Sequence, residues 1–168
     1  MTIKTNLKHR IRSGQTTVGA ATPLTATKSR IEDIIGSSDY SFLSVDSQHN
    51  AYGERALVEV CEAADQVGVP VMFRIKHTRH SYLIGNILDL GPAGVEVPQT
   101  ETEETAQEAL DYFYYPQVGK RSWGGPPSSW KADFSDLFNH LIQGQHILRD
   151  HGYTNGLIYR HNVRFLCG

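Results

Sequence analysis

Short apolar segments alternate along the chain with longer stretches in which apolar residues recur every three or four positions. The apolar segments are rich in β-branched and aromatic side chains, as buried strands are. They read TTVGA from Thr16, YSFLSV from Tyr40, VPVMFRI from Val69 and GVEV from Gly94. Successive segments begin at intervals that leave room for one strand and one helix, which is the spacing of consecutive βαβ units. The pattern predicts an α/β fold in which helices cover a parallel sheet.

Helical periodicity and stop signals fill the intervals between these segments. One predicted helix ends at Gly68 and has four apolar residues on one face: Leu57, Val60, Cys61 and Ala64. The stretch SYLIGNILDL, residues 81–90, is predicted to be a single helix that ends at Gly91. Capping boxes predict the first turns of two more helices: Ser29 with Glu32, and Thr100 with Glu103.

Composition narrows the class of protein. The 168 residues carry 16 Lys and Arg against 18 Asp and Glu, so a net charge of −2 gives no sign of a nucleic-acid partner. No apolar run approaches the ~20 residues that span a bilayer, and the two cysteines form no disulfide framework. We expect a cytoplasmic protein with no membrane partner. Residues 1–31 have the basic composition of a transit peptide, but their helix-stop-strand pattern favours a folded start.

Beyond residue 113 the alternation stops. The stretch YYPQVGKRSWGGPPSSW is a long Gly/Pro/Ser-rich loop, which is typical of a functional rim loop or a linker. Residues 134–142 regain helical spacing, and the last 16 residues read as a short strand or an unattached tail.

Polar side chains follow the predicted strands at their carboxyl ends, where α/β folds bind ligands. Asp46, Gln48 and His49 come after the second strand, and Arg74 ends the third. Asp46 and His49 are close enough in sequence for the carboxylate to hold the imidazole by one ring nitrogen. The alternative is an Asp-initiated turn with a surface histidine. Because these groups come together at the carboxyl ends of neighbouring strands, we favour a functional site.

His77 and His80 are a second candidate, because two histidines three apart can ligate a metal ion. Lys76 and Arg79 are their neighbours, and such a site would be unusually positive. A solvated loop or an anion-facing patch is the favoured interpretation.

Five pieces of the chain, in order, resemble the HpcH/HpaI aldolase/citrate lyase family, whose members include 2,4-dihydroxyhept-2-ene-1,7-dioate aldolase. They are GQTTVGAATP, DYSFLSVDSQH, VPVMFRI, NILDLGPAGVEVPQTETEETA and YYPQVGKRSWGG, and together they cover about residues 7–125. The resemblance implies a (β/α)₈ TIM-type barrel, of which this chain would supply about four parallel βα units plus a helical or irregular tail. Residues 1–134 would be the barrel part and residues 135–168 a divergent tail.

The resemblance also assigns roles to residues. His49 matches the family's catalytic histidine and Asp46 its carboxylate partner, which together form an acid–base dyad. Arg74 matches the arginine that contacts the keto-acid oxygen and stabilises the enolate. Gln48 stands where many relatives carry Glu, and Asp89 matches an aspartate that reaches toward a neighbouring subunit's site.

By the same resemblance, the activity is that of a class II aldolase, which cleaves 4-hydroxy-2-oxo acids to pyruvate and an aldehyde with Mg²⁺, Mn²⁺ or Co²⁺ and assembles as trimers or hexamers. The family's metal ligands, a Glu in a Gln-x-Glu setting and a later Asp, have no match here, because residues 143–145 read Gln-Gly-Gln. The chain alone is therefore expected not to be a competent metal-dependent aldolase. The alternative function is a non-catalytic family member that at most associates with full-length relatives.

Overall fold

The computed structural model describes residues 3–116, 118–122 and 162–166. None of the helices in these ranges has the length and apolar character needed to cross a bilayer. The elements, with η1 a 3-10 helix, are in chain order α1 Ile3–Arg12, β1 Gly19–Ala21, α2 Lys28–Gly36, β2 Phe42–Asp46, α3 Glu54–Val67, β3 Val71–Arg74, η1 Thr78–Leu83, α4 Ile84–Asp89, β4 Gly94–Pro98, α5 Glu103–Phe113 and β5 Asn162–Leu166.

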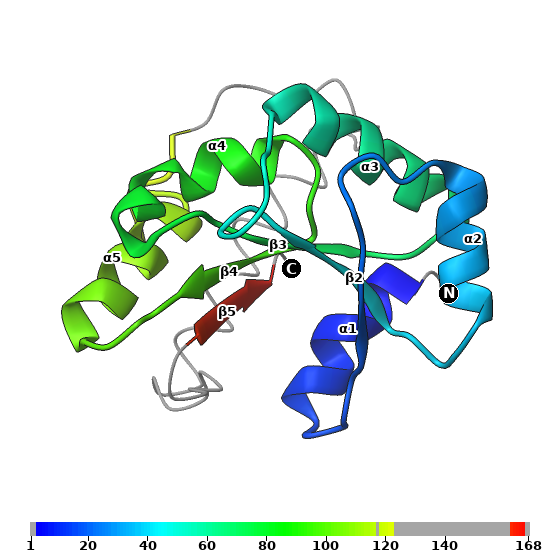
Figure 1. Ribbon diagram of the computed structural model, residues 1–168. Helices are drawn as coiled ribbons and strands as arrows, with labels where there is room; N and C mark the ends of the chain where they lie inside the picture. Colours follow the sequence, from blue (N-terminus) through cyan, green and yellow to red (C-terminus); the bar gives the residue numbers. More distant parts are fainter. Residues whose placement is uncertain (1–2, 117, 123–161, 167–168) are drawn as a thin grey trace.

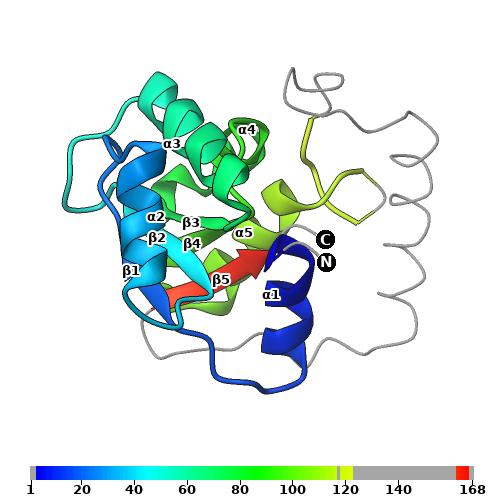
Figure 2. The same ribbon diagram turned by 90° about the vertical axis from the view of Figure 1, so that its right-hand side faces the viewer.

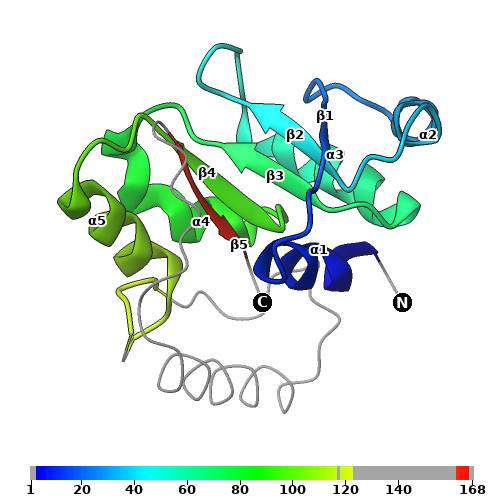
Figure 3. The same cartoon turned by 90° about the horizontal axis from the view of Figure 1, so that it is seen from below.

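The strands form one sheet in the order β1-β2-β3-β4-β5 (Figure 1). The first four are parallel, and each is paired with its neighbour in sequence, as the strand–helix alternation predicts. Their carboxyl ends therefore lie along one edge of the sheet. β5 runs antiparallel to β4, beside which it lies in Figure 3. The final segment, predicted as a strand or a tail, is thus a strand over 162–166, while the helix predicted near 134–142 lies outside the described residues.

The core lies between the sheet and the helices that follow its strands. Alternate strand residues face these helices and are at most 1% exposed: Leu43, Val45, Phe73, Val95 and Val97. Complete burial of such a side chain contributes about 1.5–3 kcal/mol. On the opposite face α1 packs through Leu7 against Phe42 and Met72. Figures 1 and 2 show α1 on one side of the sheet and α2 and α3 on the other.

Some helix boundaries agree with the prediction and others do not. Gly68 ends α3 in the left-handed conformation at φ 81°, as predicted. The two N-cap positions predicted from capping boxes are each wrong by two residues. Thr27 caps α2 by accepting from the Arg30 N–H at 3.3 Å, and Thr102 caps α5 by accepting from the Thr105 N–H at 3.3 Å.

The Thr100 hydroxyl has another partner, which explains the later start of α5. It donates to the Val97 carbonyl at 3.3 Å, in a turn where Gln99 adopts φ 52°. This turn carries the chain away from β4 before the helix begins, so a residue further along has the extended backbone that an N-cap needs.

The helix predicted over 81–90 is in fact two elements, η1 and α4. The His77 ring starts η1 earlier than expected, because its Nδ1 accepts from the Arg79 N–H at 3.1 Å. Within α4, a Cβ on Gly85 would lie 2.7 Å from the Arg121 side chain. The absence of a side chain at Gly85 lets the loop after α5 pack directly on this helix.

Candidate active site

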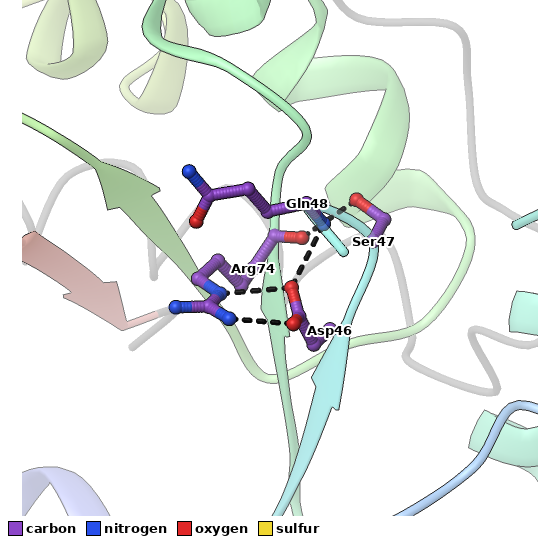
Figure 4. A network of polar contacts seen from close by, with 4 residues as sticks. All are labelled: Asp46, Ser47, Gln48 and Arg74. Carbon is purple, nitrogen blue, oxygen red and sulfur yellow. Dashed lines mark hydrogen bonds and ion pairs between the residues drawn. The ribbon is translucent and has the colours of Figure 1, made fainter. Parts of the chain in front are cut away.

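The carboxyl ends of β2 and β3 carry an ion pair between neighbouring strands. The register places Asp46 directly opposite Arg74. The Arg74 Nε donates to Asp46 Oδ1 at 2.8 Å and Nη2 donates to Oδ2 at 2.5 Å (Figure 4). The two side chains are only 25% and 22% exposed. This two-bond geometry fixes the plane of the guanidinium as well as its distance.

The loop after β2 is tied to the same strand ends. Ser47 binds the Arg74 carbonyl twice, by its hydroxyl at 2.7 Å and its N–H at 3.1 Å. The Gln48 N–H donates to Asp46 Oδ1 at 2.8 Å. These contacts hold the loop across the top of β3, and they leave few ways for Asp46 to change its orientation (Figure 4).

The electrostatics of the pair favour the charged state of both members. The pKa of Asp46 is lowered, mainly by the hydrogen bond from Arg74 and against the effect of burial. The Gln48 N–H and the positive charges of Arg74 and His49 lower it further. The pKa of Arg74 is raised, mainly by its hydrogen bond to Asp46, with a smaller contribution from the charge of Glu96. The site therefore presents a permanent cation of fixed orientation.

His49 lies on the exposed loop after β2, close enough for its charge to act on Asp46. The direct Asp46–His49 hydrogen bond expected from their spacing is not formed, and within the described residues the His49 ring has no hydrogen-bond partner. The physical reason is competition, because the rigid fork of Arg74 matches both carboxylate oxygens at once. Arg74 and the Gln48 N–H use three of the roughly four acceptor positions of the carboxylate, and they orient it toward Arg74.

Comparison with known proteins shows which proteins the chain is similar to. No family model matches the chain. The chain is 30% identical over 146 residues to the 2-keto-3-deoxy-L-rhamnonate aldolase of Klebsiella pneumoniae, which takes in 81% of this chain and 53% of that protein. Among solved structures, the HpcH/HpaI aldolase of Desulfitobacterium hafniense matches with a TM-score of 0.66 at 25% identity, over 80% of this chain and 52% of that one. These matches support membership of the HpcH/HpaI aldolase family, at partial coverage.

The chain spans about half the length of the curated relatives it matches. The citrate synthase SbnG shares the fold, with a TM-score of 0.62 at 24% identity over 86% of this chain and 52% of that one. Four parallel βα units in sequential order correspond to part of a (β/α)₈ barrel, so the predicted fold class is confirmed.

Of the other residues predicted from the family resemblance, Gln48 lies at the site, and Asp89, which was expected to reach toward a neighbouring subunit's site, lies elsewhere in this chain. Gln48 is half-buried beside the pair. Asp89 ends α4, which leads back to the start of β4, so it lies toward the opposite end of the sheet from Arg74. There it forms an ion pair with Arg121, a residue only 5% exposed whose guanidinium stacks 4.6 Å from the Tyr115 ring centroid.

The described residues do not fit a divalent cation. Among them, no three His, Cys, Asp or Glu side chains come together as a ligand group. Both Asp46 oxygens are engaged by Arg74, and the Nδ1 of His77 is engaged as a helix cap. Residues 143–145, where the family resemblance would require a carboxylate ligand and the sequence has none, lie outside the described residues. We assign no chemical step through a metal.

Glu96, in the middle of β4, is a residue to which the sequence analysis gave no role. It lies directly opposite Arg74 in the register and is only 6% exposed. The signal was present in the sequence, because a carboxylate between Val95 and Val97 interrupts an otherwise apolar buried strand.

Proposed function

We propose that this chain forms the oxo-acid site of an aldolase-type carbon–carbon lyase that acts on 4-hydroxy-2-oxo acids. The observation that carries the proposal is the Asp46–Arg74 pair, a fixed cation at the carboxyl ends of two parallel strands. Membership of the HpcH/HpaI aldolase family supports the reaction class. The name of the Klebsiella relative, an aldolase of a deoxy sugar acid, is consistent with an oxo-acid substrate.

Arg74 would bind the substrate through the N–H groups that Asp46 leaves unused. Cleavage breaks the C3–C4 bond of the oxo acid, and its electron pair becomes the enolate of pyruvate. Negative charge then develops on the former keto oxygen. A cation already held in place stabilises that charge without reorganising during the reaction. In this arrangement Asp46 is the residue that positions Arg74.

His49 would serve as the acid–base group. Histidine exchanges protons near neutral pH, and the exposed ring beside the pair can take the C4 hydroxyl proton through a water molecule. Loss of that proton turns C4 into the aldehyde carbonyl as the C3–C4 bond breaks. Protonation of the enolate at C3 then completes pyruvate.

The test is binding of oxalate, a planar mimic of the pyruvate enolate, to the purified chain by isothermal titration calorimetry. Arg74→Met should weaken binding about 10–100-fold, the effect expected when a charged hydrogen-bond donor is lost. Arg55→Met is the matched control, because Arg55 forms an exposed ion pair on α3. Oxalate that fails to bind, or binds equally to wild type and Arg74→Met, would overturn the proposal.

Pyruvate release from a 4-hydroxy-2-oxo acid, followed by a lactate dehydrogenase coupled assay, separates recognition from chemistry. Release that is lost in Arg74→Met supports the full lyase function. Oxalate binding without release would limit the described residues to oxo-acid recognition.

A further inference from the structure

Glu96 belongs to the same level of the sheet as the Asp46–Arg74 pair. The register joins Asp46 to Arg74 and Arg74 to Glu96 across three adjacent strands. The residue before each of them, Val45, Phe73 or Val95, is buried on the helix side. Because strand side chains alternate between faces, the three charged residues share the opposite face. In Figure 4, β4 lies on the side of Arg74 away from Asp46.

The burial of Glu96 requires a compensating charge. Its side chain is in the middle of β4 and the residue is only 6% exposed, between two valines that are fully buried. An ionised carboxylate in such a place costs several kcal/mol unless a cation or donors face it. The charge of Glu96 acts on Arg74, where it favours the protonated guanidinium.

The antiparallel strand β5 continues the row. Its register places position 164, an arginine, directly opposite Glu96. The backbone register thus runs across four strands at one level, from position 46 to position 164.

We propose that Glu96 is a positioning residue of the site, which holds the Arg74 guanidinium from β4 while Asp46 holds it from β2. The proposal rests on the proposed function for the identity of the ligand that Arg74 receives. A guanidinium restrained on both sides keeps one orientation toward the oxo acid, and this is the condition for stabilising the enolate charge.

The test follows Arg74 itself by NMR. The Nε–H of Arg74 donates a hydrogen bond to Asp46, so the exchange of this proton with solvent reports how often the pair opens. Glu96→Gln and Glu96→Met should speed this exchange by about three- to fivefold, near the top of the range for loss of one partly screened charge–charge interaction. Glu96→Asp, which keeps the charge, should restore slow exchange in part. The methionine variant protects the test against a fold that does not tolerate a buried amide.

Asp46→Ala is the positive control, since it removes the acceptor of the Arg74 Nε–H. Arg164→Gln tests whether Glu96 acts only through β5. Exchange of the Arg74 proton within twofold of wild type in both neutral Glu96 variants would overturn the proposal. Exchange as fast in Arg164→Gln as in Glu96→Gln would overturn it as well, because Glu96 would then serve the β4–β5 pairing. Oxalate is also added to the wild-type sample. If it leaves the Arg74 Nε–H signal unchanged, the proposed function is contradicted, but the role of Glu96 is not.

Discussion

Asp46→Asn should destabilise the fold by an amount set by the geometry of the pair. Two unit charges about 4 Å apart attract by roughly 4 kcal/mol at an effective dielectric constant of about 20. Desolvation offsets much of this, and side chains that are 25% and 22% exposed are partly screened by water. Removing the carboxylate also leaves Arg74 without its partner. We expect a net loss of about 2 kcal/mol, between the values for exposed and fully buried pairs.

The stability difference between wild type and Asp46→Asn should depend on pH in a definite direction. Because the pKa of Asp46 is lowered in the folded state, the pair stabilises the fold fully only well above the ordinary value of 3.8. That stabilisation is lost as the pH falls through 3.8 toward the lower pKa of the folded protein. The difference in unfolding free energy between wild type and Asp46→Asn should therefore be constant near neutral pH and shrink in acid.

Urea unfolding at a series of pH values, followed by circular dichroism, measures that difference. At neutral pH the variant should also melt about 4–8 °C below wild type, as about 2 kcal/mol does for a domain of this size. Glu59→Gln is the matched control, because it removes an exposed ion pair with Arg55 and should change stability far less. If the two variants lose the same stability, or the Asp46→Asn deficit is unchanged in acid, the reasoning from the pair is wrong.

Three further predictions concern a cap, a turn and the proposed chemistry. Thr102→Ala should lose about 1 kcal/mol of unfolding free energy by removing the α5 cap, and Thr100→Ala should lose less. Gly68→Ala should lose about 1 kcal/mol because φ is 81° there, whereas Gly36→Ala, which meets nothing within 4 Å, should not. Urea unfolding checks both pairs, and the reverse order would refute either assignment. In a catalytically complete form of the protein, His49→Ala should lower pyruvate release by ~10²–10⁴-fold in the coupled assay, and an unchanged rate would remove His49 from the mechanism.

The elements that the sequence determined are those whose signals are local. The apolar segments at Tyr40, Val69 and Gly94 become β2, β3 and β4 within two residues, because runs of such side chains are stable only when buried. Gly68 ends α3 for an equally local reason, since glycine tolerates the left-handed turn. The gathering of polar residues at one end of the sheet could be predicted from the strands alone, because parallel strands have their carboxyl ends on the same side.

The partners of the site residues were decided by the tertiary structure. From the sequence, the nearest group for Asp46 is His49, three positions away. In the fold it is Arg74, 28 positions away, which the register of β2 and β3 brings directly opposite. The position of Glu96 beside Arg74, and of β5 beside β4, likewise depends on strands that are distant in sequence. A side chain's choice of partner is a competition among all groups within reach, and only the packed sheet determines which groups those are.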